Sequence, residues 1–425
     1  MSQAKPPGHV FPFYYGWAIV TAAFLEHVLA VGITNSQGVF LKPISADFGW
    51  TRGATAGAFA LASIMTGLFV PVMGALTDKY GPRILATGQG VFMALGYLLI
   101  SQTGSPWQFY LFCALFLGIG KSAGWGSIQP TIPRWFEAKR GLAQGIVQAG
   151  GGLGSVLMPL AVTFLMVSFG WRDTYMITAL FLAVLLIPLA QILRRHPQEM
   201  GLLPDGRAEP VEKAGKGYLP LSPQGLTPGS GQGFTMRQAL ATHTLWQLFF
   251  IAIAASFAHQ LVIIHLVPHA TDTGLSPVRA ATLMSVLGIS NIVGKLTMGT
   301  VSDRIGRRAA MTLSFSLAAT MLFWVVVARG SWSLYIFAAI FGFGYGGWMP
   351  MFPTITADLF GVGSLGAIYG LVGTSMSIGW GLGAFLGGYI FDVTQSYNYA
   401  FLLAAMLLLG GIGLLLTLRP PKKTP

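Results

Sequence analysis

One apolar run ends in Gly74-Ala75-Leu76-Thr77-Asp78-Lys79-Tyr80-Gly81-Pro82-Arg83, and the pattern returns as Gly299-Thr300-Val301-Ser302-Asp303-Arg304-Ile305-Gly306-Arg307-Arg308. Further matches keep nearly the same spacing along the chain. The stretch from Gly118 to Ile132 returns from Gly342 to Ile355, and Gly141 and Gly145 match Gly366 and Gly370. Because one offset recurs at several places, the sequence predicts two related halves.

The composition places the chain in a membrane. Of its 425 residues, 53% are hydrophobic and only 9% are charged, with a mean hydropathy of +0.65, whereas a soluble domain carries about 25% charged residues. Twelve apolar runs lie between residues 15 and 418, each able to cross a core that needs ~20 residues. The polar N-terminus predicts no cleaved signal peptide. A single cysteine, Cys113, excludes an intramolecular disulfide and a thiolate metal cluster.

The distribution of basic residues predicts the orientation. Twelve crossings place both termini on one side, and 18 of the 25 Lys and Arg fall in segments of that side, against five in the opposite loops. This side is therefore expected to be cytoplasmic, and the formal charge of +12 is not a nucleic-acid footprint. We expect an all-α, multi-pass protein of the cytoplasmic (inner) cell membrane, with twelve transmembrane helices in two pseudo-symmetric six-helix bundles.

The expected domains follow from these runs. They are a cytoplasmic tail (1–14), a first bundle (15–193), a cytoplasmic linker (194–243), a second bundle (244–418) and a C-terminal tail (419–425). The linker is rich in Pro, Gly and Ser, and Phe234–Thr242 in it reads equally well as a short surface helix or an ordered loop. Parallel repeats in a membrane place a binding site near the midplane, between halves that rock around it.

The paired Gly-x-x-x-Asp-Lys/Arg-x-Gly-x-Arg loops resemble motif A of the major facilitator superfamily. Four other stretches resemble the branch of monocarboxylate transporters and the oxalate:formate antiporter: Tyr15-Gly16-Trp17; Arg134-Trp135-Phe136 with Lys139-Arg140-Gly141-Leu142-Ala143 and Gly145; His265-Leu266-Val267-Pro268-His269-Ala270-Thr271-Asp272; and Asp358-Leu359-Phe360-Gly361 with Ile368-Tyr369-Gly370. The resemblance implies the major facilitator fold, a small organic anion as substrate and neighbouring helices 1 and 4 that line the cavity of the first half.

The repeated loops predict a cytoplasmic charge latch that forms and breaks as the halves rock. An aspartate at a helix end can pair with the basic residues of a tight glycine turn. Simple positive-inside anchoring would explain the basic residues but not the two aspartates. The expected latch residues are Asp78, Lys79, Arg83, Asp303, Arg304 and Arg307.

Ionisable groups inside a bilayer are candidates for function because they are costly there. Lys295 lies near the centre of the expected path, where the resemblance implies an arginine that grips a substrate carboxylate. A lysine offers a point charge instead of a planar fork, and it could also take part in proton coupling. The alternative is a snorkelling or internally paired lysine. Asn291 and Asn35 stand where animal-type carriers have an aspartate and a lysine, so each either bonds substrate or packs helices, and that family's proton relay does not transfer.

Glu26 and Lys121 have similar expected depths on helices 1 and 4, which makes them plausible partners. Three interpretations stay open: a structural ion pair, a second anion-binding cation suited to a dicarboxylate, or a proton-coupling pair with Glu26 as carrier. His27 and His259 titrate near physiological pH, and each is either a proton carrier or a hydrogen-bonded structural residue. Trp125, Tyr345 and Trp348 are candidates for the aromatic wall of the path, with packing as the alternative.

These observations predict a secondary carrier of a monocarboxylate, of the lactate or pyruvate type, working by alternating access with proton coupling. The alternative is exchange of a dicarboxylate, of the oxalate or formate type, without net proton movement. No paired carboxylates, activated nucleophile or metal cluster favours an enzyme, so no cofactor is expected, and the two-half latch disfavours a channel. A non-transporting receptor remains open. The expected partners are the carboxylate, protons and lipid, with a monomer as functional unit.

Overall fold

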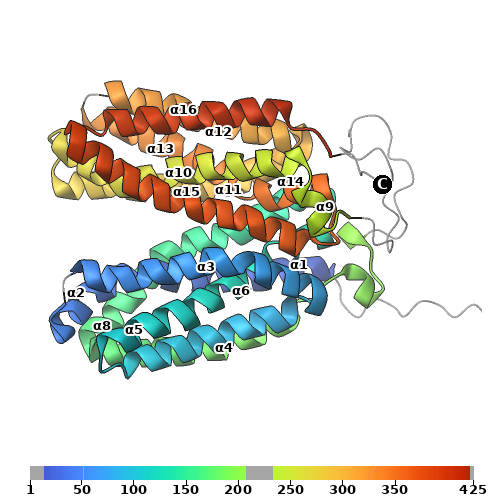
Figure 1. Ribbon diagram of the computed structural model, residues 1–425, viewed down its shortest axis with the longest axis horizontal. Helices are drawn as coiled ribbons and strands as arrows, with labels where there is room; N and C mark the ends of the chain where they lie inside the picture. The colour runs from blue at the N-terminus through green and yellow to red at the C-terminus, as the bar shows by residue number, and fades with distance from the viewer. Residues whose placement is uncertain (1–13, 51, 207–232, 329, 422–425) are drawn as a thin grey trace, which may run out of the picture.

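The computed structural model describes residues 14–50, 52–206, 233–328 and 330–421, and the secondary structure within them is helical (Figure 1). The first half contains α1 (Tyr15–Asn35), α2 (Gln37–Phe48), α3 (Arg52–Tyr80), α4 (Pro82–Ser101), α5 (Pro106–Phe112), a π-helical turn (Cys113–Leu117), α6 (Gly118–Ile128), α7 (Ile132–Trp135) and α8 (Arg140–Ile192).

Two short 3-10 turns, Pro197–Met200 and Pro204–Gly206, follow α8, and α9 (Met236–Leu240) precedes the second half. The second half contains α10 (His243–Asp272), α11 (Pro277–Ile305), α12 (Arg307–Val327), α13 (Ser331–Trp348), α14 (Met351–Phe360), α15 (Leu365–Thr394) and α16 (Asn398–Thr417). Of the two readings of Phe234–Thr242, the structure has the helix, which begins in a capping box between Thr235 and Gln238.

Ten helical segments in the described ranges are long and apolar enough to cross a membrane by length and composition. One of them, α8, reverses direction at Gly170, whose φ of 77° suits a residue without a Cβ. A straight helix of 53 residues would be ~80 Å long. Yet the Nε1 of Trp135, just before α8, donates to the carbonyl of Arg194, just after it, at 3.0 Å. The long helix α11 is not among the ten and is the least apolar of the long helices.

The apolar core is divided between the halves. One cluster of buried residues lies entirely within residues 234–418, and two others lie within residues 15–193. Trp125 of α6 is a first-half residue that packs against the second-half cluster. Figure 1 shows the two groups of helices one above the other, with α9 and α14 at one end. Each half therefore buries its own apolar surface.

Two symmetry-related helix pairs join the halves: α3 packs on α15, and α8 packs on α11. Both contacts depend on glycine. A Cβ on Gly74 would overlap the backbone oxygen of Gly366, and one on Gly141 would overlap that of Gly299. The absence of side chains at these positions lets the helix backbones touch, as small residues do in membrane bundles.

Four helix ends meet at one end of the molecule, named here the latch end because Asp78 and Asp303 lie there. The hydroxyl of Tyr15 donates to the carbonyl of Ile192 at 2.8 Å, and that of Thr244 donates to the carbonyl of Arg419 at 2.9 Å. The starts of α1 and α10 therefore lie beside the ends of α8 and α16.

Candidate functional site

The carboxylate of Asp78, at the end of α3, binds the first turn of α15 in the other half. It accepts the backbone N–H groups of Gly366 and Ala367, each at 2.9 Å, and it is also bonded by the guanidinium of Arg134. A helix N-terminus presents free N–H groups and positive potential to an anion. This contact therefore holds the two halves together through charge-assisted hydrogen bonds.

Asp303 makes the symmetry-related contact from α11 to the first turn of α8. It accepts the N–H groups of Gly141 and Leu142 at 2.8 and 2.9 Å, and Arg307 pairs with it at 2.7 Å. Arg307 also lies 3.7 Å from Asp358, whose carboxylate accepts a bond from Arg140 of the first half at 2.5 Å. This second contact thus extends into a chain of ion pairs that crosses between the halves.

The predicted latch partners are corrected at three positions. Asp78 does not pair with the basic residues of its own loop: Lys79 lies over the ring of Tyr80, 5.0 Å from its centroid, and Arg83 donates to Gln191 at 2.6 Å. Arg304 is exposed and takes no part in the described ion pairs, whereas Arg307 does. The sequence reasoning missed Arg134, because its approach to Asp78 depends on the fold between them.

Glu26 faces the interior of the first half, where the expected pair with Lys121 does not form. Its carboxylate accepts Nδ1–H of His27 at 2.6 Å and is bonded by the amide of Gln89 on α4. Lys121 and Trp125 lie four residues apart on another face of α6, both half-buried, and Trp125 meets Trp380 of the second half. Glu26 and Lys121 lie at similar depths along α1 and α6. The rotation of these helices about their axes, however, directs the two side chains toward different neighbours.

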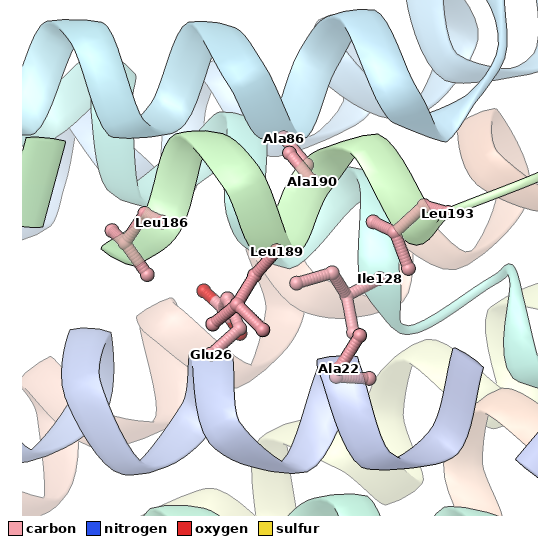
Figure 2. Close-up of a pocket in the computed structure, with 9 residues that line it drawn as sticks. Ala22, Glu26, Ala86, Ile128, Leu186, Leu189, Ala190 and Leu193 are labelled. Atoms are coloured by element: carbon pink, nitrogen blue, oxygen red, sulfur yellow. The ribbon is translucent and has the colours of Figure 1, made fainter. Parts of the chain in front are cut away.

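A cavity of about 10 Å³ adjoins the Glu26 carboxylate (Figure 2). Leu186, Leu189 and Ala190 from the second part of α8 line it together with Leu193 just after that helix, and Glu26 is its one polar lining residue. A buried water needs two to four polar partners, so this space suits no ordered water. The carboxylate therefore depends on protein partners.

Three glutamines continue the polar contacts from His27. Gln129 donates from Nε2 to Nε2 of His27 at 2.8 Å, and its Oε1 accepts from Gln148 at 3.1 Å and from Gln144. The carbonyl of Gln148 in turn accepts Nζ of Lys295 at 3.1 Å. The sequence reasoning overlooked these residues because it searched for charge. A usable signal is the spacing of Gln144 and Gln148, which puts two amides on one helix face.

Lys295 is a buried cation, 7% exposed, with no carboxylate within ion-pair distance in the part of the chain that the structure describes. Asn291 lies one turn away on the same face of α11, and its Nδ2 is buried without a hydrogen-bond partner among the described residues. Nδ1 of His259 is also buried without a hydrogen-bond partner among the described residues, and His259 lies within electrostatic range of Lys295. Unused hydrogen-bonding nitrogens therefore gather beside an uncompensated positive charge.

The remaining candidates fall in different places. His259 stacks on Tyr345 with ring centroids 3.6 Å apart, and Trp125 lies between the halves. Trp348 instead lies in the core of the second half against Phe315 and Phe352, which corrects its assignment to the wall of the path.

Asn35 is exposed and donates to Ser155 at 2.7 Å. It lies eight residues beyond His27, or ~12 Å along α1, away from Lys295.

Comparison with known proteins agrees with this architecture. The model of the Major Facilitator Superfamily matches residues 22–295 and 248–425. Monocarboxylate transporter 13 of Rattus norvegicus is 29% identical over 95% of this chain and 89% of its own length. The oxalate:formate antiporter of Oxalobacter formigenes is 27% identical over 92% of this chain and 88% of its own length. The crystal structure of a superfamily transporter, FucP, in the outward conformation covers 96% of this chain and 100% of that one with a TM-score of 0.73 at 14% identity, which is a likeness of fold.

Proposed function

This chain belongs to the Major Facilitator Superfamily, among relatives of the monocarboxylate transporters and the oxalate:formate antiporter, and we propose that it carries a small monocarboxylate across the membrane with a proton. Lys295 is the anchor of the substrate carboxylate, with Asn291 and His259 as further hydrogen-bonding groups. The carrier works by alternating access between the two halves.

The observation that carries this proposal is that Lys295 forms no ion pair with any residue that the structure describes. A buried charge in a membrane costs several kcal/mol unless it is paired or hydrated. Among the described residues, Lys295 donates one hydrogen bond, to the neutral backbone carbonyl of Gln148, and Nδ2 of Asn291 beside it has no hydrogen-bond partner. A carboxylate supplies the missing negative charge and accepts several hydrogen bonds at once.

The rocking motion follows from the latch end. We take α8 as two passes and α11 as one, which with the other nine spans gives twelve, and we assign the latch end and both termini to the cytoplasm because the basic residues gather there. Opening that side requires Asp78 and Asp303 to leave the helix N-termini they bind. The N-terminal bundle, 15–193, and the C-terminal bundle, 244–418, then separate at that end.

The test is a binding series on the purified protein with pyruvate, lactate, formate and oxalate, read by thermal shift. Lys295→Gln should abolish carboxylate binding while the fold persists, and Lys295→Arg should retain part of it. The exposed Lys139→Gln is the matched control and should bind as the parent does. Parent affinity in Lys295→Gln would rule out the anchor.

A second candidate, dianion exchange, is favoured by Lys121. This half-buried lysine has no ion pair among the described residues and shares a face of α6 with Trp125, which lies between the halves. A second cation suits a second carboxylate. Proteoliposomes separate the two functions: external alkalinisation that tracks uptake supports proton symport, whereas a strict need for internal anion supports exchange. For a dianion substrate, Lys121→Gln should weaken oxalate binding more than pyruvate binding.

A further inference from the structure

A series of hydrogen bonds between buried residues, through side chains and finally the backbone of Gln148, leads from the interior of the first half to the boundary between the halves. It runs from Glu26 through His27 and Gln129 to the side-chain amide of Gln148, and the backbone carbonyl of that same residue accepts Nζ of Lys295. All five residues are less than a tenth exposed. The path connects α1, the α6–α7 junction, α8 and α11, so a change at one end has a physical route to the other.

The bonds along this path fix the positions of its protons. Because Oε1 of Gln129 accepts from two other glutamines, its Nε2 must face His27 and donate there. Nε2 of His27 therefore carries no proton, and the single ring proton lies on Nδ1, which donates to Glu26. The structure thus holds a neutral imidazole beside a carboxylate.

A second proton on His27 would place two donors face to face, Nε2–H of the ring and Nε2–H of Gln129. Inversion of the Gln129 amide removes this conflict by turning Oε1 toward His27. Its Nε2 then needs an acceptor on α8, and Oε1 of Gln144 is buried there without a hydrogen-bond partner among the described residues. Gln148 also donates to Oε1 of Gln129, so both Gln144 and Gln148 must invert to turn acceptors toward Gln129 and restore the hydrogen bonds from His27 to α8. The same side chains therefore support two arrangements that differ by one proton.

We propose that Glu26 and His27 form a proton-binding site, and that Gln129 is a positioning residue that transmits its protonation through Gln144 and Gln148 to the α8–α11 contact at Lys295. Protonation reorients the glutamines on α8 beside the carbonyl that holds Lys295. It thereby loosens the contact and favours separation of the halves at the latch end. The role of this separation in transport rests on the proposed function, but the proton site itself does not.

Other charged groups around Glu26 and His27 are few or already paired. On α4, the contact is the neutral Gln89, and the second part of α8 contributes aliphatic side chains. Lys121 lies on α6 two turns from Gln129. On α11, Lys295 is the charged residue bonded to Gln148, and Asp303 is bonded by Arg307 and the start of α8. The groups near the ends of the packed elements are these: Arg134 paired with Asp78, Arg140 paired with Asp358, Arg172 paired with Asp47, and Asp205, which accepts the backbone N–H groups of Glu137 and Ala138.

The first test reads the proton site without any substrate. The ring of His27 stacks on Trp125, with centroids 6.4 Å apart and an angle of 28°, and a protonated imidazole quenches indole fluorescence. The difference between the parent and Trp125→Phe isolates this signal in a pH titration. When ionised, the carboxylate of Gln129→Glu offers only acceptors to His27, so the Trp125 signal should change at higher pH than in the parent.

Gln247→Glu is the matched control for this titration, because Gln247 is a buried glutamine of the second half bonded to Thr417. It should leave the midpoint unchanged. A Trp125 signal that does not change between pH 4 and 9 in the parent would overturn the proton site.

The second test measures whether protonation at Glu26 and His27 changes the separation of the halves. Spin labels at Tyr80→Cys and Ile305→Cys, two exposed positions of the latch end, report the separation of the halves in a Cys113→Ala background. Acidification should lengthen this distance in the parent, and in Gln129→Glu it should do so at higher pH. In Gln129→Met the distance should no longer respond to pH, while the Trp125 signal still titrates.

A merely structural role for Gln129 would lower stability without separating these two responses. If Gln129→Met does not fold, Gln129→Asn replaces it, because the shorter amide cannot reach His27 and α8 together. A pH response of the distance equal to that of the parent in either variant would overturn the transmission. Neither readout uses a carboxylate, so failure here leaves the proposed substrate anchor standing, and failure of Lys295→Gln leaves the proton site standing.

Discussion

The first latch is the contact of Asp78 with α15, and the second latch is the contact of Asp303 with α8. Both make the same kind of contact between the halves, but they differ in the arginine that pairs with the aspartate. Asp78 and Asp303 each accept two backbone N–H groups from a helix of the opposite half. Asp303 takes its arginine from the next turn, at Arg307, whereas the repeat has Pro82 at that position and Asp78 is supported by Arg134 from another element. The repeated part of the motif is thus the part that crosses between the halves, and each half supports it differently.

This difference makes the two latches unequal in their dependence on one residue. Arg134 is the one cation within ion-pair distance of Asp78 among the described residues, and its side chain is 0% exposed. Arg307 shares its charge between two carboxylates, and Asp358 has a second partner in Arg140. The first latch should therefore fail more completely when its arginine is removed.

The largest effect is expected from Arg134→Gln. Removal of one partner from a buried ion pair leaves the other charge uncompensated and typically costs about 3–5 kcal/mol. The free energy of unfolding in detergent measures this loss, and the label distance between Tyr80→Cys and Ile305→Cys should increase. A loss below about 1 kcal/mol would mean that the two N–H groups alone hold Asp78.

Adding Pro82→Arg to Arg134→Gln should recover part of that loss. The new arginine lies four residues after Asp78, as Arg307 does after Asp303, and a charge-assisted hydrogen bond contributes about 1.5–3 kcal/mol. The same unfolding experiment compares the double and single variants. A further loss in the double variant would show that the difference between the loops does not reside at this position.

Arg307→Gln should cost less, about 1–3 kcal/mol. Asp303 keeps its two backbone donors, and Asp358 keeps Arg140. Measured beside Arg134→Gln under the same conditions, the order of the two losses tests the comparison. An equal or larger loss in Arg307→Gln would contradict it.

The smallest effect is a dependence on pH confined to the first latch. Burial, together with the charges of Arg134 and Arg195, lowers the pKa of His196 from 6.5 to about 4. Because the folded state holds His196 neutral, its contribution to stability is complete above pH 6.5 and is lost as the pH falls toward 4. His196→Asn should remove this part of the pH dependence in thermal unfolding. An unchanged profile would assign the acid sensitivity to other groups.

The sequence predicted the parts of this molecule that follow from periodicity and repetition. The all-helical membrane fold, its family and the position of both aspartates at the ends of α3 and α11 are visible in the apolar runs and the repeated motif. These features are local, or repeat at a fixed spacing, so no tertiary information is needed to find them.

The predictions of side-chain partners were wrong where the partner depends on the rotation of a helix or on tertiary packing. Glu26 and Lys121 match in depth, but Glu26 faces α4 while Lys121 shares a face with Trp125. Arg134 reaches Asp78 only because the fold brings its guanidinium on α7 to the end of α3. The glutamines that connect His27 to Lys295 carry no charge, so a search for ionisable groups within apolar runs passes over them, although buried amides form equally specific contacts.

The unpaired charge of Lys295 also has an electrical consequence for the proposed cycle. A positive group with no ion pair in the described ranges moves through part of the membrane field whenever the halves rock around it, and a full crossing of one charge is worth about 2.3 kcal/mol per 100 mV. Once a carboxylate neutralises Lys295, the same movement transfers no net charge there. Membrane voltage should therefore act on the Lys295 charge in the unloaded return step and not in the loaded step.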